Sequence, residues 1–241
     1  MIEIAAPAGP AAAYLAGERG KPGVLLYVDA IGLRPRIEEM ADRIASWGHV
    51  VLAPHVFYRD GSISDLAPSG DLREPGERER FFASGVMDRV GALTPDLSTP
   101  DAEAWVRVLT EHAGPGPLGV VGYCMGARLA VRTAGQFPGA VAAVGGFHGA
   151  RLVTDGADSP HLVIAASTAE YVFGHADRDA SMPLEQVAAL EEALTAAGRP
   201  HLNEVYQGAA HGYTMADTSV YDEAATERHF RVLRDLFART L

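Results

Sequence analysis

Short apolar runs alternate with amphipathic segments along the chain, and this alternation is its main structural signal. The apolar runs are rich in Val, Leu and Ile and too short for helices; they cover residues 24–28, 50–53, 118–123, 140–145, 171–174 and 202–206. Runs that are apolar at nearly every position are typical of parallel strands covered on both faces. We therefore predict a buried, mostly parallel sheet.

The segments between these runs carry apolar residues at helical spacing. One helical face holds Ile37, Met40, Ile44 and Trp47, a second holds Trp105, Val108, Leu109 and His112, and a third, in residues 221–241, holds Phe230, Leu233, Phe237 and Leu241. Strands that alternate with helices in this way predict an α/β fold, a doubly wound sheet with right-handed crossovers and helices on both faces.

Capping residues predict where two of these helices begin or end. Thr99-Pro100-Asp101 offers an N-cap, a proline at the first helical position and an acid in the first turn, so we expect a helix to start there. Gly198 is expected to close a helix that begins near Pro183.

Two further segments do not follow the alternation. Residues 2–15 are broken by Pro7, Gly9 and Pro10 and predict a β-hairpin, added antiparallel at the sheet edge. Residues 58–100 mix charged side chains with Phe81 and Phe82, and we interpret them as short helices or loops that cover a cleft. No linker divides the chain, so we expect a single domain over residues 1–241.

Composition and charge narrow the function classes. Apolar residues make up 48% of the chain and charged residues 21%, which is ordinary for a soluble globular protein. The 20 Lys and Arg against 31 Asp and Glu give a formal net charge of −11, which disfavours nucleic acid or an anionic membrane as partner and favours a small molecule. With one cysteine, no secretory signal and no run of about 18 apolar residues, we expect a cytoplasmic protein that does not enter a membrane.

The candidate chemistry begins at Gly122-Tyr123-Cys124-Met125-Gly126, which lies between a predicted strand and a predicted helix. This is the pattern of a nucleophile elbow, in which small neighbours let the strand and the helix approach while the turn exposes one side chain. Here that side chain is the thiol of Cys124. A thiol attacks a carbonyl carbon well only as a thiolate, so it needs a nearby base or a lowered pKa.

Two later strand ends supply the remaining groups in the order nucleophile, acid, histidine. Asp177 and Asp179 follow the run at 171–174, and His211 follows the run at 202–206. We predict that His211 accepts the proton of Cys124 and that Asp179, or alternatively Asp177, orients the imidazole. The backbone N–H groups of Met125 and Ala30 are the expected oxyanion hole.

Four motifs together carry a family resemblance. They are Asp29-Ala30-Ile31-Gly32, the elbow around Cys124, Asp179 with Pro183 four residues later, and His211-Gly212-Tyr213. From residue 24 through His211 and into the last helix, the chain resembles the dienelactone hydrolase family. The resemblance implies an α/β-hydrolase fold and a Cys-His-Asp triad that hydrolyses lactones or related carboxylic esters, as a carboxymethylenebutenolidase does, without a cofactor.

The resemblance also implies a role for Asp29. It matches the position of a family acid, usually a glutamate, that approaches the resting thiol and helps to deprotonate it. Known members carry an arginine shortly after the catalytic histidine that holds a substrate carboxylate. Here the residues that follow His211 are Gly212, Tyr213, Thr214 and Met215, so this chain departs from the pattern on which recognition of a dienelactone depends.

Other candidates and alternatives complete the prediction. The residues expected to line a substrate pocket are Tyr58, Arg59, Phe147, His148 and Tyr213. No ligand spacing predicts a metal, and no glycine motif predicts a nucleotide cofactor. Two other functions stay open: a hydrolase-fold protein that binds a small ligand without turnover, and a redox sensor that uses the thiol of Cys124.

Overall fold

One sheet of eight strands organises the computed structural model, which describes residues 1–241. In spatial order the strands are β1 (Ile2–Ala6), β2 (Gly9–Ala16), β4 (Val50–Pro54), β3 (Gly23–Tyr27), β5 (Leu118–Tyr123), β6 (Val141–Phe147), β7 (Glu170–Ala176) and β8 (His201–Tyr206). β1 and β2 form an antiparallel hairpin that joins β4 antiparallel, and all other pairs are parallel. The predicted sheet and its N-terminal hairpin are confirmed.

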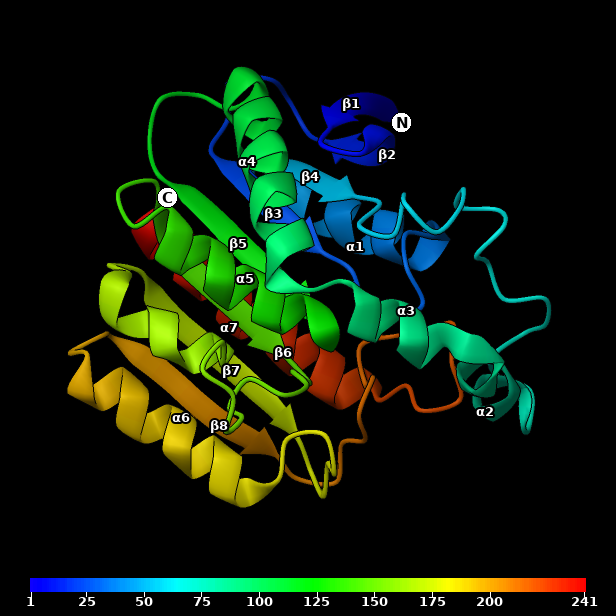
Figure 1. Cartoon of the computed structure of the whole chain (residues 1–241). Helices are drawn as coiled ribbons and strands as arrows, with labels where there is room; N and C mark the ends of the chain where they lie inside the picture. Colours follow the sequence, from blue (N-terminus) through cyan, green and yellow to red (C-terminus); the bar gives the residue numbers. More distant parts are fainter.

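Helices cover both faces of the sheet (Figure 1). One face carries α4 (Pro95–His112), α5 (Met125–Gln136) and α6 (Leu184–Ala196), and the other carries α1 (Pro35–Ala45) and α7 (Glu223–Thr240). Contacts between α7 and the α1 region join the helices of the second face: Arg43 pairs with Glu227 at 2.6 Å, and the rings of Trp47 and Phe230 lie 6.0 Å apart. This is the doubly wound arrangement that the sequence predicts.

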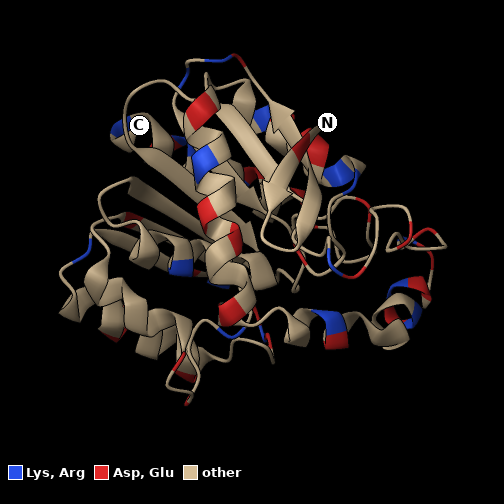
Figure 2. Ribbon diagram, turned by 45° about the horizontal axis from the view of Figure 1, so that its top comes forward, with Lys and Arg blue, Asp and Glu red and all other residues tan.

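The central strands form the core because both of their faces are covered. Every residue of β3, β4 and β5 is buried, whereas β8 at the sheet edge is buried only at its last residue. Charged residues lie mainly on the helices and loops around the sheet (Figure 2). None of the helices combines the length and the apolar character that crossing a lipid bilayer requires.

The start of α4 corrects one prediction. The helix begins at Pro95, with Thr94 as its N-cap, and Pro100 lies inside it. Residues 94–96 and 99–101 are both Thr-Pro-Asp, so the same capping pattern occurs twice and the structure uses the first copy. Asp101 is therefore no first-turn acid; its side chain is buried and binds other residues, as described below.

Residues 58–100 contain two short helices, α2 (Glu77–Phe81) and α3 (Met87–Ala92), at the edge of the sheet where the parallel strands end (Figure 1). The backbone between them, Phe82–Val86, leaves helical geometry at Ser84 and at Gly85, which has a φ of +91°. A positive φ of this size strains residues with a Cβ but not glycine. The segment therefore bends at Gly85.

Candidate active site

Cys124 lies in the sharp turn between β5 and α5. Its φ of 53° and ψ of −119° are values that residues with a Cβ rarely adopt, and backbone strain of this kind is concentrated at functional sites. A Cβ on Gly122 would overlap the carbonyl oxygen of Gly126, and a Cβ on Gly126 would overlap that of Val28. The turn therefore requires glycine on both sides of Cys124, as the elbow pattern predicts.

The backbone around Cys124 is held in place by its neighbours. Its N–H donates to the carbonyl of Phe147 at 3.1 Å, and its carbonyl accepts from Ala127 and Ala150 at 3.2 Å each. The side chain lies at the N-terminal end of α5, where unpaired N–H groups and the helix dipole favour an anion.

His211, in the loop after β8, is joined to Asp179, in the loop after β7. The imidazole Nδ1 donates to Asp179 Oδ2 at 2.6 Å. The other carboxylate oxygen accepts from the backbone N–H and the hydroxyl of Ser181, at 2.8 and 2.6 Å. These bonds fix the carboxylate and orient the imidazole so that Nε2 is free for another partner.

Cys124, His211 and Asp179 influence the charge states of one another. Burial disfavours an imidazolium, but Cys124 and Asp179 outweigh it and raise the pKa of His211 to about 10. Burial also opposes charge on Asp179, yet His211 and Ser181 lower the pKa of that carboxyl. Cys124, His211 and Asp179 are therefore electrostatically coupled in the order that proton transfer from a thiol requires.

The structure distinguishes between the two aspartates. Asp177 does not contact His211: its Oδ2 accepts from the N–H of Gly208 at 3.0 Å, and its own N–H donates to Ala209 at 2.8 Å. Both bonds connect the loop after β7 to the loop that carries His211. Asp177 thus holds the histidine loop in place, whereas Asp179 is bonded to the imidazole itself.

A small pocket opens beside the thiol. Its volume is about 20 Å³, and its lining residues are Asp29, Ala30, Ile31, Arg78, Phe82, Cys124, His148, His211, Gly212, Met215 and Thr218. This is roughly the space that one water molecule needs. Arg78 and Phe82 come from α2 and the bend that follows it, so part of the segment at 58–100 closes the pocket.

Five residues were predicted to line a substrate pocket, and of these the structure places His148 at the pocket beside the thiol. It is fully buried, its Nε2 lies 2.8 Å from the hydroxyl of Thr214, and its ring centroid is 5.4 Å from that of His211. Burial and then the charge of His211 hold the pKa of His148 well below its usual range. His148 therefore adds a neutral imidazole to the wall of the pocket.

The other predicted substrate residues lie elsewhere. Arg59 forms two bonds with the carboxylate of Asp101, at 2.5 and 2.9 Å, and the hydroxyl of Tyr58 donates to the same carboxylate at 2.9 Å. Phe147 and Tyr213 are fully buried; Phe147 stacks on Tyr123, and the Tyr213 hydroxyl donates to a backbone carbonyl. The prediction that these four line the substrate pocket is not supported, because an ion pair and the core engage them.

Asp29 also differs from expectation. Its carboxylate lines the pocket but is engaged by Arg34, at 2.7 and 3.1 Å, and accepts from the N–H groups of Ile31 and Gly32. Arg34 binds a second carboxylate, that of Asp217, at 2.5 Å. No hydrogen bond joins Asp29 to the thiol, and its carboxylate instead bonds to the backbone of the loop after β3 and to Arg34.

Sequence reasoning missed three arginines and a serine near the site. Arg34 holds Asp29, and Ser181 holds Asp179. Arg89 donates to the carbonyl of Ala30 at 2.9 Å, and Arg78 reaches the carbonyl of His211 at 3.5 Å. Of these four residues, only Ser181 could have been predicted from the sequence, because a serine two residues after an aspartate commonly bonds to it in a turn. Arg89 and Arg78 bind residues that are 59 and 133 positions away, and Arg34 binds Asp217, 183 positions away, in addition to the nearby Asp29.

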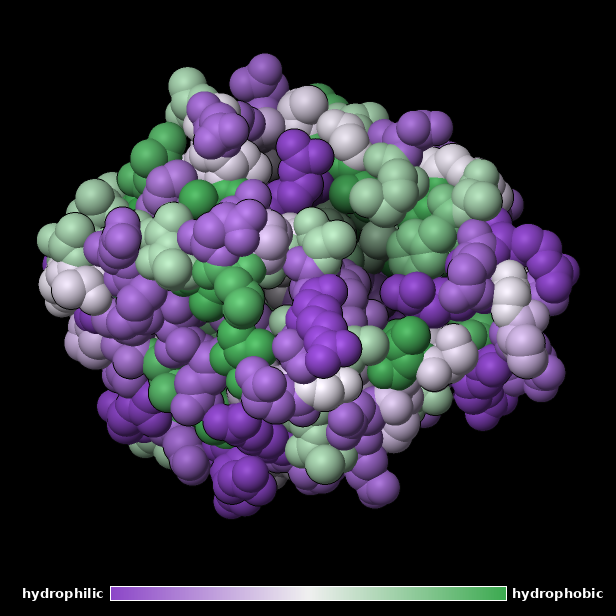
Figure 3. All heavy atoms as spheres, turned by 90° about the horizontal axis from the view of Figure 1, so that it is seen from below, coloured by the Kyte–Doolittle hydropathy of each residue, from purple (hydrophilic) through white to green (hydrophobic).

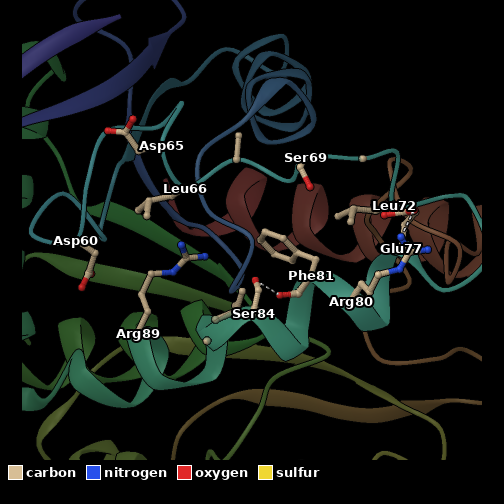
Figure 4. A pocket seen from close by; sticks show the side chains of 14 residues that line it. Asp60, Asp65, Leu66, Ser69, Leu72, Glu77, Arg80, Phe81, Ser84 and Arg89 are labelled. Carbon is tan, nitrogen blue, oxygen red and sulfur yellow. Dashed lines mark hydrogen bonds and ion pairs between the residues drawn. The ribbon is translucent and has the colours of Figure 1, made fainter.

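A second, larger cavity lies on the other side of the α2–α3 segment. Its volume is about 510 Å³, and Arg89 and Phe81 reach into it opposite Leu66 and Ser69 (Figure 4). Arg89 therefore connects this cavity to the Ala30 loop of the thiol pocket. The molecular face seen in Figure 3 is mostly hydrophilic, with scattered apolar patches and a hollow near its centre.

Comparisons with known proteins agree with this architecture. A model of the dienelactone hydrolase family matches residues 11–241. The chain is 25% identical to a putative carboxymethylenebutenolidase of Methylorubrum extorquens over 223 residues, covering 90% of this chain and 71% of the relative. It is 27% identical to a carboxymethylenebutenolidase of Rhodococcus opacus over 211 residues, covering 86% and 75%.

Solved structures show the same fold. A putative dienelactone hydrolase of Klebsiella pneumoniae superposes with a TM-score of 0.79 at 20% identity, covering 98% of this chain and 96% of the other. An acylaminoacyl peptidase of Pyrococcus horikoshii superposes with a TM-score of 0.64 at 14% identity, covering all of this chain and 41% of the other. The chain has the α/β-hydrolase fold and belongs to the dienelactone hydrolase family.

Proposed function

We propose that this protein hydrolyses a lactone or carboxylic ester through a thioester intermediate on Cys124, with His211 as the base and Asp179 as its orienting acid. One observation carries the proposal. The strained elbow places the thiol at the N-terminus of α5, beside an imidazole that donates its other nitrogen to a fixed carboxylate at 2.6 Å. This arrangement can form a thiolate and an imidazolium before substrate arrives.

The first half of the reaction forms the thioester. The thiolate sulfur attacks the carbonyl carbon, and the electron pair of the C=O bond moves onto its oxygen. When this tetrahedral species collapses, the C–O bond to the alcohol breaks, and the departing oxygen takes the proton held by His211. A lactone would open at this step, with its alcohol still attached to the acyl group.

The second half releases the acid. A water molecule gives a proton to His211 and attacks the thioester carbonyl, and the C–S bond breaks as the thiolate leaves. The enzyme returns to its starting state, and the products are an acid and an alcohol, or one hydroxy acid from a lactone. Asp179 stabilises the imidazolium in both halves.

The oxyanion would accept hydrogen bonds from the N–H groups of Met125 and Ala30. Met125 is the first residue of α5, where N–H groups lack partners within the helix. Ala30 follows β3, and the loop there is fixed from two sides because Arg89 binds the Ala30 carbonyl and Arg34 binds Asp29. A donor that is fixed before reaction stabilises developing charge most effectively.

Substrate entry requires the pocket to enlarge. A volume of about 20 Å³ cannot hold an ester, so Phe82 and Arg78 must move. The bend at Gly85 is the point at which the segment can change direction. Arg78 contacts the carbonyl of His211 at 3.5 Å and the ring of Phe82 but forms no ion pair with a carboxylate of the chain, so an anionic group on the substrate could pair with it.

Turnover of p-nitrophenyl acetate by the wild type, Cys124→Ala and Cys124→Ser tests the proposal. We expect Cys124→Ala to abolish turnover with an unchanged far-UV circular dichroism spectrum, and intact-mass spectrometry of the wild type to show an acylated Cys124. Unchanged turnover in Cys124→Ala would reject the proposal. Retention of a ligand without product would indicate a binding protein, and peroxide sensitivity without an acyl-enzyme would indicate a redox sensor.

A further inference from the structure

A basic pocket lies beside α5, apart from the thiol pocket. Its volume is about 250 Å³, and it shares no lining residue with the pocket of Cys124. The pocket is formed by the end of α3, the start of α4 and the loop that joins them, by one side of α5, and by the chain that follows β6. The lining residues are Gly91, Leu93, Thr94, Pro95, Ser98, Arg128, Leu129, Arg132, Arg151, Thr154, Asp158 and Pro160.

The charge of this pocket is opposite to that of the whole chain. Three arginines and one aspartate line it, which leaves a surplus of two positive charges, whereas the chain has a formal net charge of −11. A protein with few basic residues has gathered three of them around one cavity. Like charges repel, so such a cluster is stable only with solvent or an anion between its members.

The contacts of the arginines leave most of this charge uncompensated. Arg128 donates to the carbonyl of Val90 at 2.9 Å and pairs with no carboxylate. Arg132 bonds to the backbone carbonyl of Asp158 at 2.6 Å and lies 3.5 Å from its carboxylate. The guanidinium of Arg151 forms neither a hydrogen bond nor an ion pair within the chain.

The electrostatic environment supports the same conclusion. Burial lowers the pKa of Arg128, and Arg132 and Arg151 lower it further against the opposing effect of Cys124. Burial and the neighbouring arginines thus destabilise the charged form of Arg128, and an anion bound among the three arginines would stabilise it.

Uncharged donors complete the pocket. Thr94, Ser98 and Thr154, which carry hydroxyl groups, are among its lining residues, and α4, an 18-residue helix, begins there at Pro95. The positive end of this helix dipole adds to the field of the arginines. The lining thus contains three guanidinium-bearing and three hydroxyl-bearing residues, a set of donors that suits a ligand group with several acceptor oxygens.

We propose that this pocket binds a phosphate group, as inorganic phosphate or as the phosphate end of a small monoester. A phosphate carries close to two negative charges at neutral pH and three terminal oxygens, which matches the surplus of two charges and the three arginines. A carboxylate brings one charge and two oxygens and leaves part of the cluster unpaired. The 250 Å³ volume also leaves room for a small organic group beside the phosphate.

Isothermal titration calorimetry at low ionic strength, in a phosphate-free buffer, tests the proposal with two probes: inorganic phosphate and ribose 5-phosphate. We expect saturable 1:1 binding below about 10 mM for at least one probe. Tighter binding of ribose 5-phosphate would identify a monoester as the ligand, and equal binding would identify free phosphate. Binding of neither probe would overturn the proposal.

Three variants and one chemically modified protein test where the ligand binds. Arg151→Gln, at an exposed residue with no side-chain partner, and the double variant Arg132→Gln/Arg151→Gln should weaken binding by about tenfold for each arginine removed. Arg231→Gln, at an exposed arginine on α7, is the matched control and should bind as the wild type does. Protein alkylated at Cys124 should also bind normally. Equal affinity in Arg151→Gln and wild type, or loss of binding on alkylation, would refute this location.

Discussion

Replacement of Asp179 by asparagine removes one charge from the candidate site and changes almost nothing else. The two side chains have the same shape, and an amide oxygen can still accept both bonds from Ser181. The amide NH₂ would then face His211 Nδ1, where the carboxylate oxygen now lies at 2.6 Å. Two donors cannot share one hydrogen bond, so the imidazole must place its proton on Nε2 instead.

This change of tautomer sets the size of the effect. With its proton on Nε2, His211 can no longer accept the proton of the Cys124 thiol, and it also loses the carboxylate that stabilises its cation. In a serine triad the same substitution lowers kcat by about 10⁴-fold. A thiol ionises more easily than a hydroxyl, so we expect a loss of about 10³-fold here, or about 4 kcal/mol in the activation free energy.

Asp177→Asn provides the matched control two residues away. It makes the same chemical change in the same loop, but its carboxylate binds the Gly208 N–H and does not contact His211. We expect kcat/KM for p-nitrophenyl acetate to fall by no more than about tenfold in this variant. The reasoning is refuted if Asp179→Asn keeps its activity within threefold of the wild type, or if both variants lose activity equally.

Four other changes have expected outcomes. Burial opposes charge on His211, but the neighbouring thiol and carboxylate raise its pKa to about 10, so the stability from its imidazolium is complete below pH 6.5 and is lost as pH rises toward 10. Urea denaturation should therefore show the unfolding free energies of wild type and His211→Asn converging over that window; a constant difference would contradict this. Gly126→Ala should lower the free energy of unfolding by about 3 kcal/mol because the added Cβ would overlap backbone oxygens. Gly139→Ala, which has open space around it, should lower it by less than about 1 kcal/mol, and similar urea midpoints for the two variants would argue against this packing. Arg34→Met should cost about 3 kcal/mol of unfolding free energy because it leaves two carboxylates without their partner, and a loss below about 1 would show that the ion pairs stabilise little. Phe82→Ala should enlarge the thiol pocket and so raise the ratio of kcat/KM for p-nitrophenyl butyrate to kcat/KM for p-nitrophenyl acetate by about tenfold. An unchanged ratio would show that the Phe82 ring does not limit the size of the pocket.

Much of the fold was predictable because its signals are local. Strands covered on both faces must be apolar along their whole length, so β3, β4 and β5 stand out as runs in the sequence. The elbow is also encoded locally, because Gly122 and Gly126 are required by contacts with the adjacent strand and helix. The predicted start of α4 was wrong because the capping triplet Thr-Pro-Asp occurs twice within a few residues.

The partners of the charged residues were not predictable. Arg34 and Asp217 are 183 positions apart, and Arg59 and Asp101 are 42 apart, yet each pair is in direct contact. No periodicity marks which acid an arginine will meet, because the choice depends on how loops from different strands converge. This is why the sequence assigned Arg59 to a substrate pocket, although it is bound to Asp101. Asp29 is different: its partner Arg34 is only five residues away, and the family resemblance, not a local pattern, assigned Asp29 to the thiol.

The pairing of Asp29 with Arg34 bears on how the thiol would be activated. The carboxylate oxygens of Asp29 are occupied by the guanidinium of Arg34, at 2.7 and 3.1 Å, and by the N–H groups of Ile31 and Gly32, and no hydrogen bond joins them to the thiol. In our proposal the proton of Cys124 therefore goes to His211 alone, and the thiolate is stabilised by the N-terminus of α5. The Asp29–Arg34 pair then acts on the reaction through position: it fixes the loop that presents the Ala30 N–H, so the acid after β3 serves the oxyanion hole instead of the nucleophile.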